Sequence, residues 1–469
     1  MRRLSRLTLL VLLSPIALSA QGNYLIDWEE VGEESINHLI NLVRINTSNP
    51  PGNETEAAVY LQKALAAEDI SSDLYALDPD RANLVARYKG NGSKRPILVM
   101  GHTDVVGVQA EKWTEEPFGG LRKDGWIYGR GTLDDKDNVT AGLMLMLLLH
   151  RYEVELDRDI IFLAESGEEG TPEVGINYMI DHHWDKIEAE FCLAEGGGNV
   201  LGDHGVEVVG IQTAEKTPRR ATLIATGTAG HGSVPRLDNP ITAIAKAVSR
   251  LGEWHTEMRL NSTTRAYFER LAAMSSEEDA WRYRNIENPE ETEEIQQYFL
   301  ESYPFHYSVL RSSIVPTIID GGFRKNVIPS EASAMLDIRM LPDEDVDAFY
   351  DQMREIIDNP SIQVVPEAIY RPVSPTSPVD NEMFQVLETV ASEMYPDATI
   401  LPRMSTGATD MAQIRARGVP AYGIGAIRSV EELNSGNGAH GDNERVSEDS
   451  IKQLVEFIWY TILAIAASE

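Results

Sequence analysis

Two residues that suit a metal site, His102 and Asp104, follow an apolar run at residues 96–100 and flank Thr103. If that run is a strand, the side chains of His102 and Asp104 leave the extended backbone on the same side. A carboxylate in that position can orient the second ring nitrogen of a metal-bound imidazole. Taken alone, the pair fits a structural histidine beside a capping aspartate equally well.

A second candidate ligand, Asp134, opens the acidic run Asp134-Asp135-Lys136-Asp137. The run follows a glycine-rich segment at residues 128–131 and precedes an apolar stretch with helical spacing at residues 138–152. A solvated acidic turn that caps this helix is the simpler interpretation of the run by itself. A metal role for Asp134 becomes the better interpretation only when other ligands are added.

The adjacent pair Glu168-Glu169 follows Gly167, after another apolar run at residues 159–164. Neighbouring residues in an extended segment point to opposite sides. One carboxylate can then bind a metal ion while the other holds a metal-bound water and accepts its proton, which suits metal-assisted hydrolysis. A solvated acidic loop is the alternative, and it becomes less favoured as candidate ligands accumulate.

Two further residues complete a ligand set. Glu195 precedes three glycines, and His440 lies within residues 437–442; a turn residue and a surface histidine are the respective alternatives. Two histidines and three carboxylates suit Zn²⁺, or Co²⁺ or Mn²⁺ in its place. Five ligands exceed the needs of one catalytic zinc and fit two ions that share a bridging carboxylate. Thiolate ligation is excluded, because Cys192 is the only cysteine and is expected to pack in an apolar run.

The elements that must position these residues alternate between apolar strands and helices. Strands are predicted at residues 96–100, 159–164 and 189–194, and helices at residues 138–152 and 173–181. This alternation predicts an α/β fold with a largely parallel sheet. Side chains that carry function gather beyond the carboxyl ends of the strands in such sheets, which is where each cluster falls.

A chain of 469 residues exceeds what one hydrophobic core usually serves, so we expect two domains. The sequence pattern changes near residue 218. Helices are predicted at residues 239–251 and 263–301, and strands at residues 221–226, 313–320, 332–340 and 361–368. We interpret residues 216–371 as an inserted α+β domain between two parts of the catalytic domain, at residues 21–215 and 372–469. The proline-rich segment at residues 371–378 is the predicted linker back.

The chain begins with the features of an export signal: Arg2, Arg3 and Arg6, an apolar run at residues 7–18, and small residues at 19 and 20. We expect residues 1–20 to be a signal peptide and the protein to be periplasmic or secreted, with an uncleaved membrane anchor as the alternative. No later segment has the length of a membrane span. The formal net charge of −33 argues against nucleic acid as a partner.

Taken together, these motifs resemble those of the dizinc exopeptidase and aminoacylase family, metallopeptidase family 20. The family contains glutamate carboxypeptidase, aminoacylase-1, carboxypeptidase S and succinyl-diaminopimelate desuccinylase. The similarity in order and spacing rests on residues 101–106, residues 128–136, Glu168-Glu169, Glu195-Gly196 and His440-Gly441. It runs from about residue 36 to the last helix, and the segment at residues 117–120 and the long insertion are similar to the carboxypeptidase S branch.

The resemblance implies a role for each matching residue in the catalytic domain. Two Zn²⁺ ions would be bound by His102, Asp134, Glu169, Glu195 and His440. Asp134 would bridge the ions, and the peptide bond from Asp134 to Asp135 would be cis. Glu168 would be the general base, and Asp104 would orient His102.

The resemblance also implies a phosphorylase/hydrolase-like catalytic domain and an inserted lid that forms a homodimer. His231 would reach the active site of the neighbouring subunit and stabilise the oxyanion. Asn326 and Arg339 would hold the substrate carboxylate, with a strand-face ion pair as the alternative for Arg339. Gly407 lies in the loop at residues 405–410 that would offer backbone donors to the substrate.

These implications predict a zinc-dependent amide hydrolase that releases an amino acid from a small peptide or an N-acyl amino acid. Glu168 would act as general base on a metal-bound water. The alternative is a non-catalytic metal- or peptide-binding protein on the same scaffold. The enzyme is favoured because every metal position and the base are filled by competent residue types.

Overall fold

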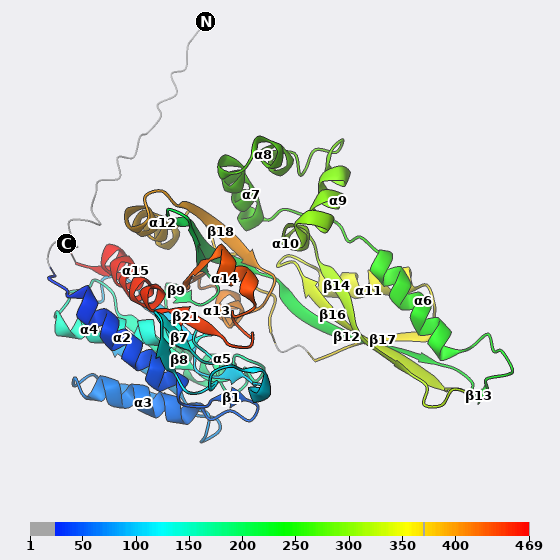
Figure 1. Ribbon diagram of the computed structural model, residues 1–469, viewed down its shortest axis with the longest axis horizontal. Coiled ribbons are helices and arrows are strands. Elements are labelled where there is room, and N and C mark those ends of the chain that lie inside the picture. Colours follow the sequence, from blue (N-terminus) through cyan, green and yellow to red (C-terminus); the bar gives the residue numbers. More distant parts are fainter. Residues whose placement is uncertain (1–23, 369–370, 469) are drawn as a thin grey trace, which may run out of the picture.

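The computed structural model describes residues 24–368 and 371–468, so the predicted signal peptide at residues 1–20 lies outside the described residues. Figure 1 shows two parts joined by long strands. Helices surround a large sheet in the part drawn on the left, and a smaller sheet with helices on one side makes up the part on the right.

The large sheet has ten strands and is parallel at its centre. Its order is β2 (Ser72–Tyr75), β3 (Asn83–Tyr88), β8 (Ile160–Glu165), β4 (Ile97–His102), β9 (Phe191–Ala194), β19 (Ala421–Gly423), β11 (Gly205–Glu215), β10 (Gly198–Gly202) and β20 (Ile427–Ser429), with β18 (Thr399–Ser405) paired to β11. Strands β8, β4, β9 and β19 are parallel neighbours, whereas β3 is antiparallel to β8 and β11 to β19. The predicted α/β class is confirmed, with a sheet that is parallel at the centre and mixed towards its edges.

Two layers of helices bury the large sheet on both faces, which explains why its central strands are apolar until their last residues, where β4 ends in His102 and β8 in Glu165. Phe162 of β8 and Trp459 belong to the core on one face, which is formed by α2 (Trp28–Val43), α3 (Glu54–Ala66), α4 (Lys136–Arg151), α12 (Glu382–Met394) and α15 (Glu448–Ala466). The core on the other face involves α5 (Ile176–Ile187) and α13 (Met411–Ala416). Cys192 is fully buried in this second core.

The smaller sheet is wholly antiparallel, in the order β14 (Ser313–Gly321), β16 (Glu331–Met340), β12 (Thr217–Thr226), β17 (Ile362–Pro366). Alternate residues of β12 and β16 are buried, because α6 (Pro240–Glu253) and α11 (Val346–Ile357) cover one face only. These strands all lie within the predicted inserted domain at residues 216–371. The domain boundaries themselves stay a prediction.

The predicted helical stretch at residues 263–301 is a separate cluster of helices, drawn above the junction of the two parts in Figure 1. It consists of α7 (Ser262–Met274), α8 (Glu277–Arg284), α9 (Thr292–Ser302) and α10 (Pro304–Val309). Phe268, Tyr283 and Phe299 pack around His306 in its core. Helix α7 packs against β18, which places the cluster beside the large sheet.

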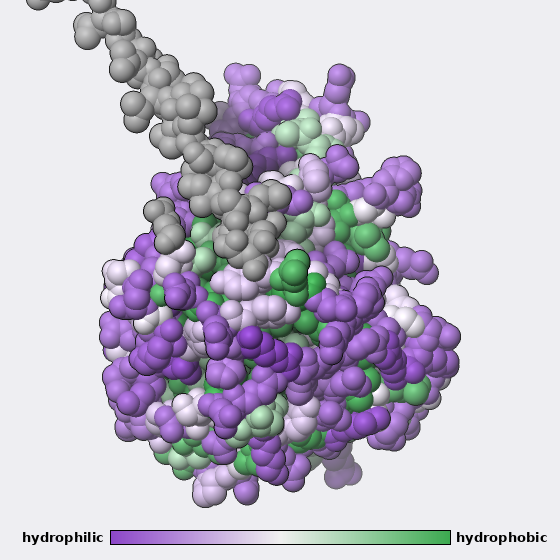
Figure 2. All heavy atoms as spheres, turned by 90° about the vertical axis from the view of Figure 1, so that its left-hand side faces the viewer, coloured by the Kyte–Doolittle hydropathy of each residue, from purple (hydrophilic) through white to green (hydrophobic). Residues whose placement is uncertain are grey.

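Short elements complete the described chain: β1 (Ser48–Asn49), β5 (Val105–Val106), η1 (Ala110–Lys112), β6 (Leu121–Lys123), β7 (Trp126–Tyr128), β13 (Gly230–His231), β15 (Val327–Ile328), α14 (Val430–Ser435) and β21 (Arg445–Ser447). The face in Figure 2 is largely hydrophilic, with apolar side chains in small scattered patches. Within the described residues, no helix combines the length and apolar character needed to cross a membrane.

Candidate metal centre

The candidate ligands gather at the edge of the large sheet where its central strands end. His102 is the last residue of β4, Glu195 follows β9 directly, and Glu168 and Glu169 lie just beyond β8. Because these three strands are parallel neighbours, their carboxyl ends meet at one edge. Asp134 reaches the same edge from the loop that precedes α4.

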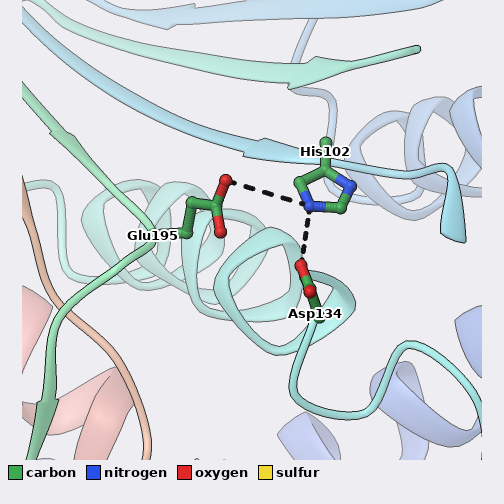
Figure 3. Close-up of side chains that lie close together, drawn as sticks. All are labelled: His102, Asp134 and Glu195. Atoms are coloured by element: carbon green, nitrogen blue, oxygen red, sulfur yellow. Dashed lines mark hydrogen bonds and ion pairs between the residues drawn. The ribbon is translucent and has the colours of Figure 1, made fainter. Parts of the chain in front are cut away.

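His102, Asp134 and Glu195 converge on one point, as Figure 3 shows. The Nε2 atom of His102 lies 2.9 Å from Asp134 Oδ1 and 4.0 Å from Glu195 Oε1. Burial alone would lower the pKa of this imidazole, but its hydrogen bonds with Asp104 and Asp134 raise the pKa well above its ordinary value. One imidazole and two carboxylates thus form the first group of metal-ligand atoms.

A second group is formed by Asp134, Glu169 and His440. His440 Nε2 lies 2.9 Å from Glu169 Oε1 and 3.1 Å from Asp134 Oδ2. Hydrogen bonds with Asp134 and Glu169 raise the pKa of His440 to about 10. Asp134 therefore offers one oxygen to each group, which is the arrangement of a bridging carboxylate.

The donor set fits two divalent cations. In each group the ligand atoms lie within 4.8 Å of one another, and all are imidazole nitrogen or carboxylate oxygen. Burial, together with the charges of Asp135 and Glu168, raises the pKa of Glu195 well above its ordinary value. Carboxylates crowded in a buried site are costly without a counter-charge, and bound cations supply one.

Asp104 ties the first group to the loop that carries Glu168 and Glu169. Its Oδ1 lies 3.4 Å from His102 Nδ1, and its backbone oxygen lies 3.0 Å from the same nitrogen. The two carboxylate oxygens accept the backbone N–H groups of Glu168 and Glu169 at 3.1 and 3.0 Å. Asp104 can thus orient the imidazole and fix the loop at once.

Glu168 lies beside the ligands but belongs to neither group. Only 7% of the residue is exposed. Burial raises the pKa of Glu168 to about 8; the charge of Arg371 opposes the rise and that of Asp410 adds to it. A carboxylate with a raised pKa is better matched to accepting a proton near neutral pH.

Arg371 is a site residue that the sequence did not reveal. Its guanidinium bonds the carboxylate of Glu168 at 2.5 Å and that of Asp410 at 2.9 Å. It lies in the segment predicted to be a proline-rich linker, where a single arginine carries no pattern that points to a role. Only the fold brings it to Glu168.

Glu444 is a second residue that the sequence did not reveal. One carboxylate oxygen accepts the backbone N–H groups of Gly131 and Leu133 at 3.1 and 2.8 Å, and the other binds Arg130 at 2.5 Å. These bonds hold the glycine-rich loop that delivers Asp134. The peptide bond between Asp134 and Asp135 is cis, as predicted.

The remaining predicted site residues do not lie with the metal-ligand cluster. His231 and Asn326 are neighbours at the tip of the inserted domain, where the N–H of Gly232 donates to the backbone oxygen of Asn326 at 2.9 Å. Figure 1 places this tip, marked by β13, at the end of the molecule opposite the large sheet. Arg339 lies on β16 and pairs with Asp337 at 2.7 Å, the strand-face ion pair considered as the alternative.

Gly407 is exposed in the loop that follows β18. Its N–H donates to the Ser405 hydroxyl at 3.0 Å. Two neighbours in this loop, Ser405 and Thr406, line a cleft beside the cluster.

This cleft has a volume of about 500 Å³, and both Asp134 and Glu195 line it. Tyr267 and Leu271 of α7 and Phe305 of α10 supply one apolar part of its wall. Further apolar lining comes from Leu133, Val200, Val208, Leu401, Met404, Ile424 and Leu433. The cleft can therefore hold an apolar group next to the candidate metal ligands.

The chain matches a known family and several of its members over most of its length. The family model described as "Peptidase family M20/M25/M40" matches residues 98–464. The human "N-fatty-acyl-amino acid synthase/hydrolase PM20D1" is 27% identical over 445 residues, which cover 92% of this chain and 87% of the human protein. The "Probable carboxypeptidase S-like 2" of Dictyostelium discoideum is 28% identical over 391 residues, covering 81% of this chain and 74% of the relative.

A solved structure agrees with the fold. The M20 family metallo-carboxypeptidase Sso-CP2 from Sulfolobus solfataricus superposes with a TM-score of 0.66 at 20% sequence identity. The superposition covers 92% of this chain and 99% of that chain.

Proposed function

The chain belongs to peptidase family M20/M25/M40, and on this premise we propose that it is a dinuclear zinc amide hydrolase with Glu168 as its general base. The observation that carries the proposal is Asp134, whose two oxygens face two separate groups of ligand atoms. His102 and Glu195 would complete one zinc site, and Glu169 and His440 the other. Co²⁺ or Mn²⁺ suits the same donors.

The reaction is hydrolysis of an amide bond. Bound zinc ions would polarise the scissile carbonyl and favour ionisation of water. Glu168 takes the proton of the attacking water and returns it to the leaving amine. Asp104 holds the backbone of Glu168 and Glu169 and orients His102, so the base and the ligands keep fixed relative positions.

The substrate would be a small peptide or an N-acyl amino acid, and the cleft favours the N-acyl class. The relative PM20D1 is named for N-fatty-acyl amino acids, and the Dictyostelium relative for carboxypeptidase S. Apolar side chains from α7 and α10 beside Asp134 and Glu195 suit an apolar acyl group better than a charged peptide amine. The loop at residues 405–410, which carries Gly407, would offer backbone donors to the bound substrate.

A homodimer and export are parts of the same proposal. His231 and Asn326 lie beside each other at the tip of the inserted domain, and Figure 1 places that tip, marked by β13, at the end of the molecule opposite the large sheet. In a dimer, His231 of the partner subunit would stabilise the oxyanion, while Asn326 and Arg339 would hold the substrate carboxylate. Export rests on residues 1–20 and the sequence alone.

The test compares hydrolysis of matched dipeptides and N-acyl amino acids that release the same amino acid, using zinc-loaded protein. The wild type should release the amino acid, preferring apolar acyl groups, and Glu168→Gln should lower kcat about 1,000-fold while keeping its metal. Glu173→Gln is the matched control, because Glu173 is exposed nearby in the same loop. Full turnover by Glu168→Gln would remove Glu168 as the base.

The same screen decides between the enzyme and the non-catalytic binding protein. Metal-loaded wild type that binds these compounds and hydrolyses none of them would favour the binding protein. Release that stops when a chelator removes the metal and resumes when zinc is restored would support the enzyme.

A further inference from the structure

Glu168, the proposed general base, is hydrogen-bonded to Arg371, a residue that has no role in the proposed function. The Nη2 atom of Arg371 donates to the Glu168 Oε1 atom at 2.5 Å and to the Glu168 backbone oxygen at 3.0 Å. A side chain and its own backbone are thus held by one donor group. Such a two-point hold restricts the rotation of the Glu168 side chain.

Arg371 is held in turn by Asp410, on the side of its guanidinium away from Glu168. Its Nη1 atom donates to Asp410 Oδ1 at 2.9 Å, and the same oxygen accepts from Gln413 Nε2 at 3.1 Å. The side chain of Asp410 is 1% exposed and that of Arg371 is 13% exposed. The guanidinium therefore lies in a nearly enclosed chain that runs from Gln413 through Asp410 to the base.

Only one oxygen of Glu168 is engaged by this chain. Among the described residues, the hydrogen bonds of its carboxylate go to Oε1 alone, and Oε2 has no protein partner. A base needs one oxygen to receive a proton, so the pattern leaves a free oxygen while it fixes the other. Arg371 thus restrains the carboxylate without blocking it.

The backbone of Arg371 is tied to the inserted domain. Arg219 of β12 donates from Nη1 to the Arg371 backbone oxygen at 3.1 Å. Strand β12 is the first strand of the smaller sheet in chain order. Arg371 follows β17, the last strand of that sheet, where the chain returns to the large sheet. Arg371 is therefore positioned by both parts of the molecule.

We propose that Arg371 is a positioning residue that holds the Glu168 carboxylate in its reactive orientation. The inference rests on the proposed function, since it needs Glu168 to act as the base. Orientation of a catalytic group affects the rate of reaction much more than the binding of substrate. Loss of Arg371 should therefore lower kcat and leave KM nearly unchanged.

The experiment measures kcat, KM and zinc content for Arg371→Ala and Arg371→Lys with the best substrate of the wild type. We expect Arg371→Ala to lower kcat about 100-fold, with KM within about threefold of wild type and zinc content retained. Arg371→Lys keeps the charge but loses the fork of donors, so it should recover about tenfold of the lost rate. Added guanidinium should partly restore the alanine variant, because it can make the hydrogen bonds to Glu168 and Asp410 that the removed side chain made.

The matched control is Arg220→Met. Arg220 follows Arg219 on β12, its side chain is 62% exposed, and its guanidinium lies 4.0 Å from the carboxylate of Glu367. This variant should leave kcat and KM unchanged. A crystal structure of zinc-loaded Arg371→Lys adds a readout that does not depend on turnover, and should show the Glu168 carboxylate in more than one orientation.

Unchanged kcat in both Arg371 variants would overturn the inference, as would a rise in KM without a fall in kcat. If Arg371→Ala does not fold, the lysine variant decides by the same criteria. Wild-type protein that holds two zinc ions and hydrolyses nothing would overturn the proposed function, and the inference with it. Active wild type with active Arg371 variants would overturn the inference alone.

Discussion

A buried lysine away from the candidate metal centre should make the stability of the molecule depend on pH. Lys216 joins β11 to β12, where the chain passes into the inserted domain, and it has no exposed surface. Its Nζ donates to the Ser308 backbone oxygen at 3.1 Å and to the Ser313 hydroxyl at 3.0 Å. Burial lowers the pKa of Lys216 to about 7, and the charges of Arg339 and Arg311 add to the decrease.

Replacing this residue by Lys216→Met should flatten the dependence of stability on pH. Between about pH 7 and the ordinary lysine pKa of 10.5, the unfolded chain binds the proton and the folded chain does not. The free energy of unfolding of the wild type should therefore rise with pH in this range and fall as pH drops towards 7. Within this range, the lysine should change that free energy by about 1.4 kcal/mol per pH unit.

Denaturant unfolding across this pH range measures the free energy of unfolding of the wild type and of Lys216→Met. Taking the difference between the two proteins cancels the titration of the other groups. The gap between the two proteins should move in favour of the wild type as pH rises. Parallel curves would show that Lys216 stays protonated in the folded protein.

At the residue scale, the sequence predicted which candidate ligands converge and missed the residues that contact them. His102, Asp134 and Glu195 stand in motifs with distinctive order and spacing, so their convergence was foreseeable. Arg371 and Glu444 contact residues that are far away in the chain. No local pattern marks such a partner, because its role depends on the fold that brings it into place.

Periodicity predicted most of the elements near the site. Helix α4 and strands β4, β8 and β9 each begin and end within two residues of their predicted ranges. These strands are buried on both faces, which favours a continuous apolar run up to the carboxyl end of each strand and makes them easy to recognise. The antiparallel strands at the sheet edges include short or partly exposed segments, such as β10, and gave a weaker signal.

For the helical cluster of α7 to α10, the sequence predicted the helices but not their position in the fold. Its helical character was predicted from residues 263–301, but its place beside the metal centre was not. Helix α7 packs on β18, and Tyr267 and Leu271 of that helix face the cleft that Asp134 and Glu195 line. Which face of a polar helix meets a distant strand depends on tertiary packing, which periodicity does not encode.

At the scale of the whole molecule, residues assigned to one proposed active site lie at opposite ends of the fold. The candidate metal ligands lie at the large sheet, and His231 lies in β13 at the far tip of the inserted domain. The outer strand β14 exposes Val315, Ile318 and Ile319, which suits contact with a second copy of the chain. A homodimer would bring His231 of the partner subunit to each metal centre.

Complementation between two inactive variants tests this arrangement. Glu168→Gln and His231→Ala should each be nearly inactive alone. A mixed dimer would contain one site built from the intact Glu168 and the intact His231, so co-expression of equal amounts should restore about a quarter of wild-type activity. Light scattering would establish the dimer separately. No recovery in a proven mixed dimer would place His231 outside the partner's site.

The central claim is that five side chains from separate segments form one centre for two metal ions around Asp134. Metal content per chain, measured after removal and readdition of zinc, tests it most directly. The account predicts two zinc ions in the wild type and in the Glu173→Gln control, and loss of both ions from Asp134→Ala because both groups share its carboxylate. A wild-type chain that holds a single ion, or an Asp134→Ala chain that still holds two, would contradict it.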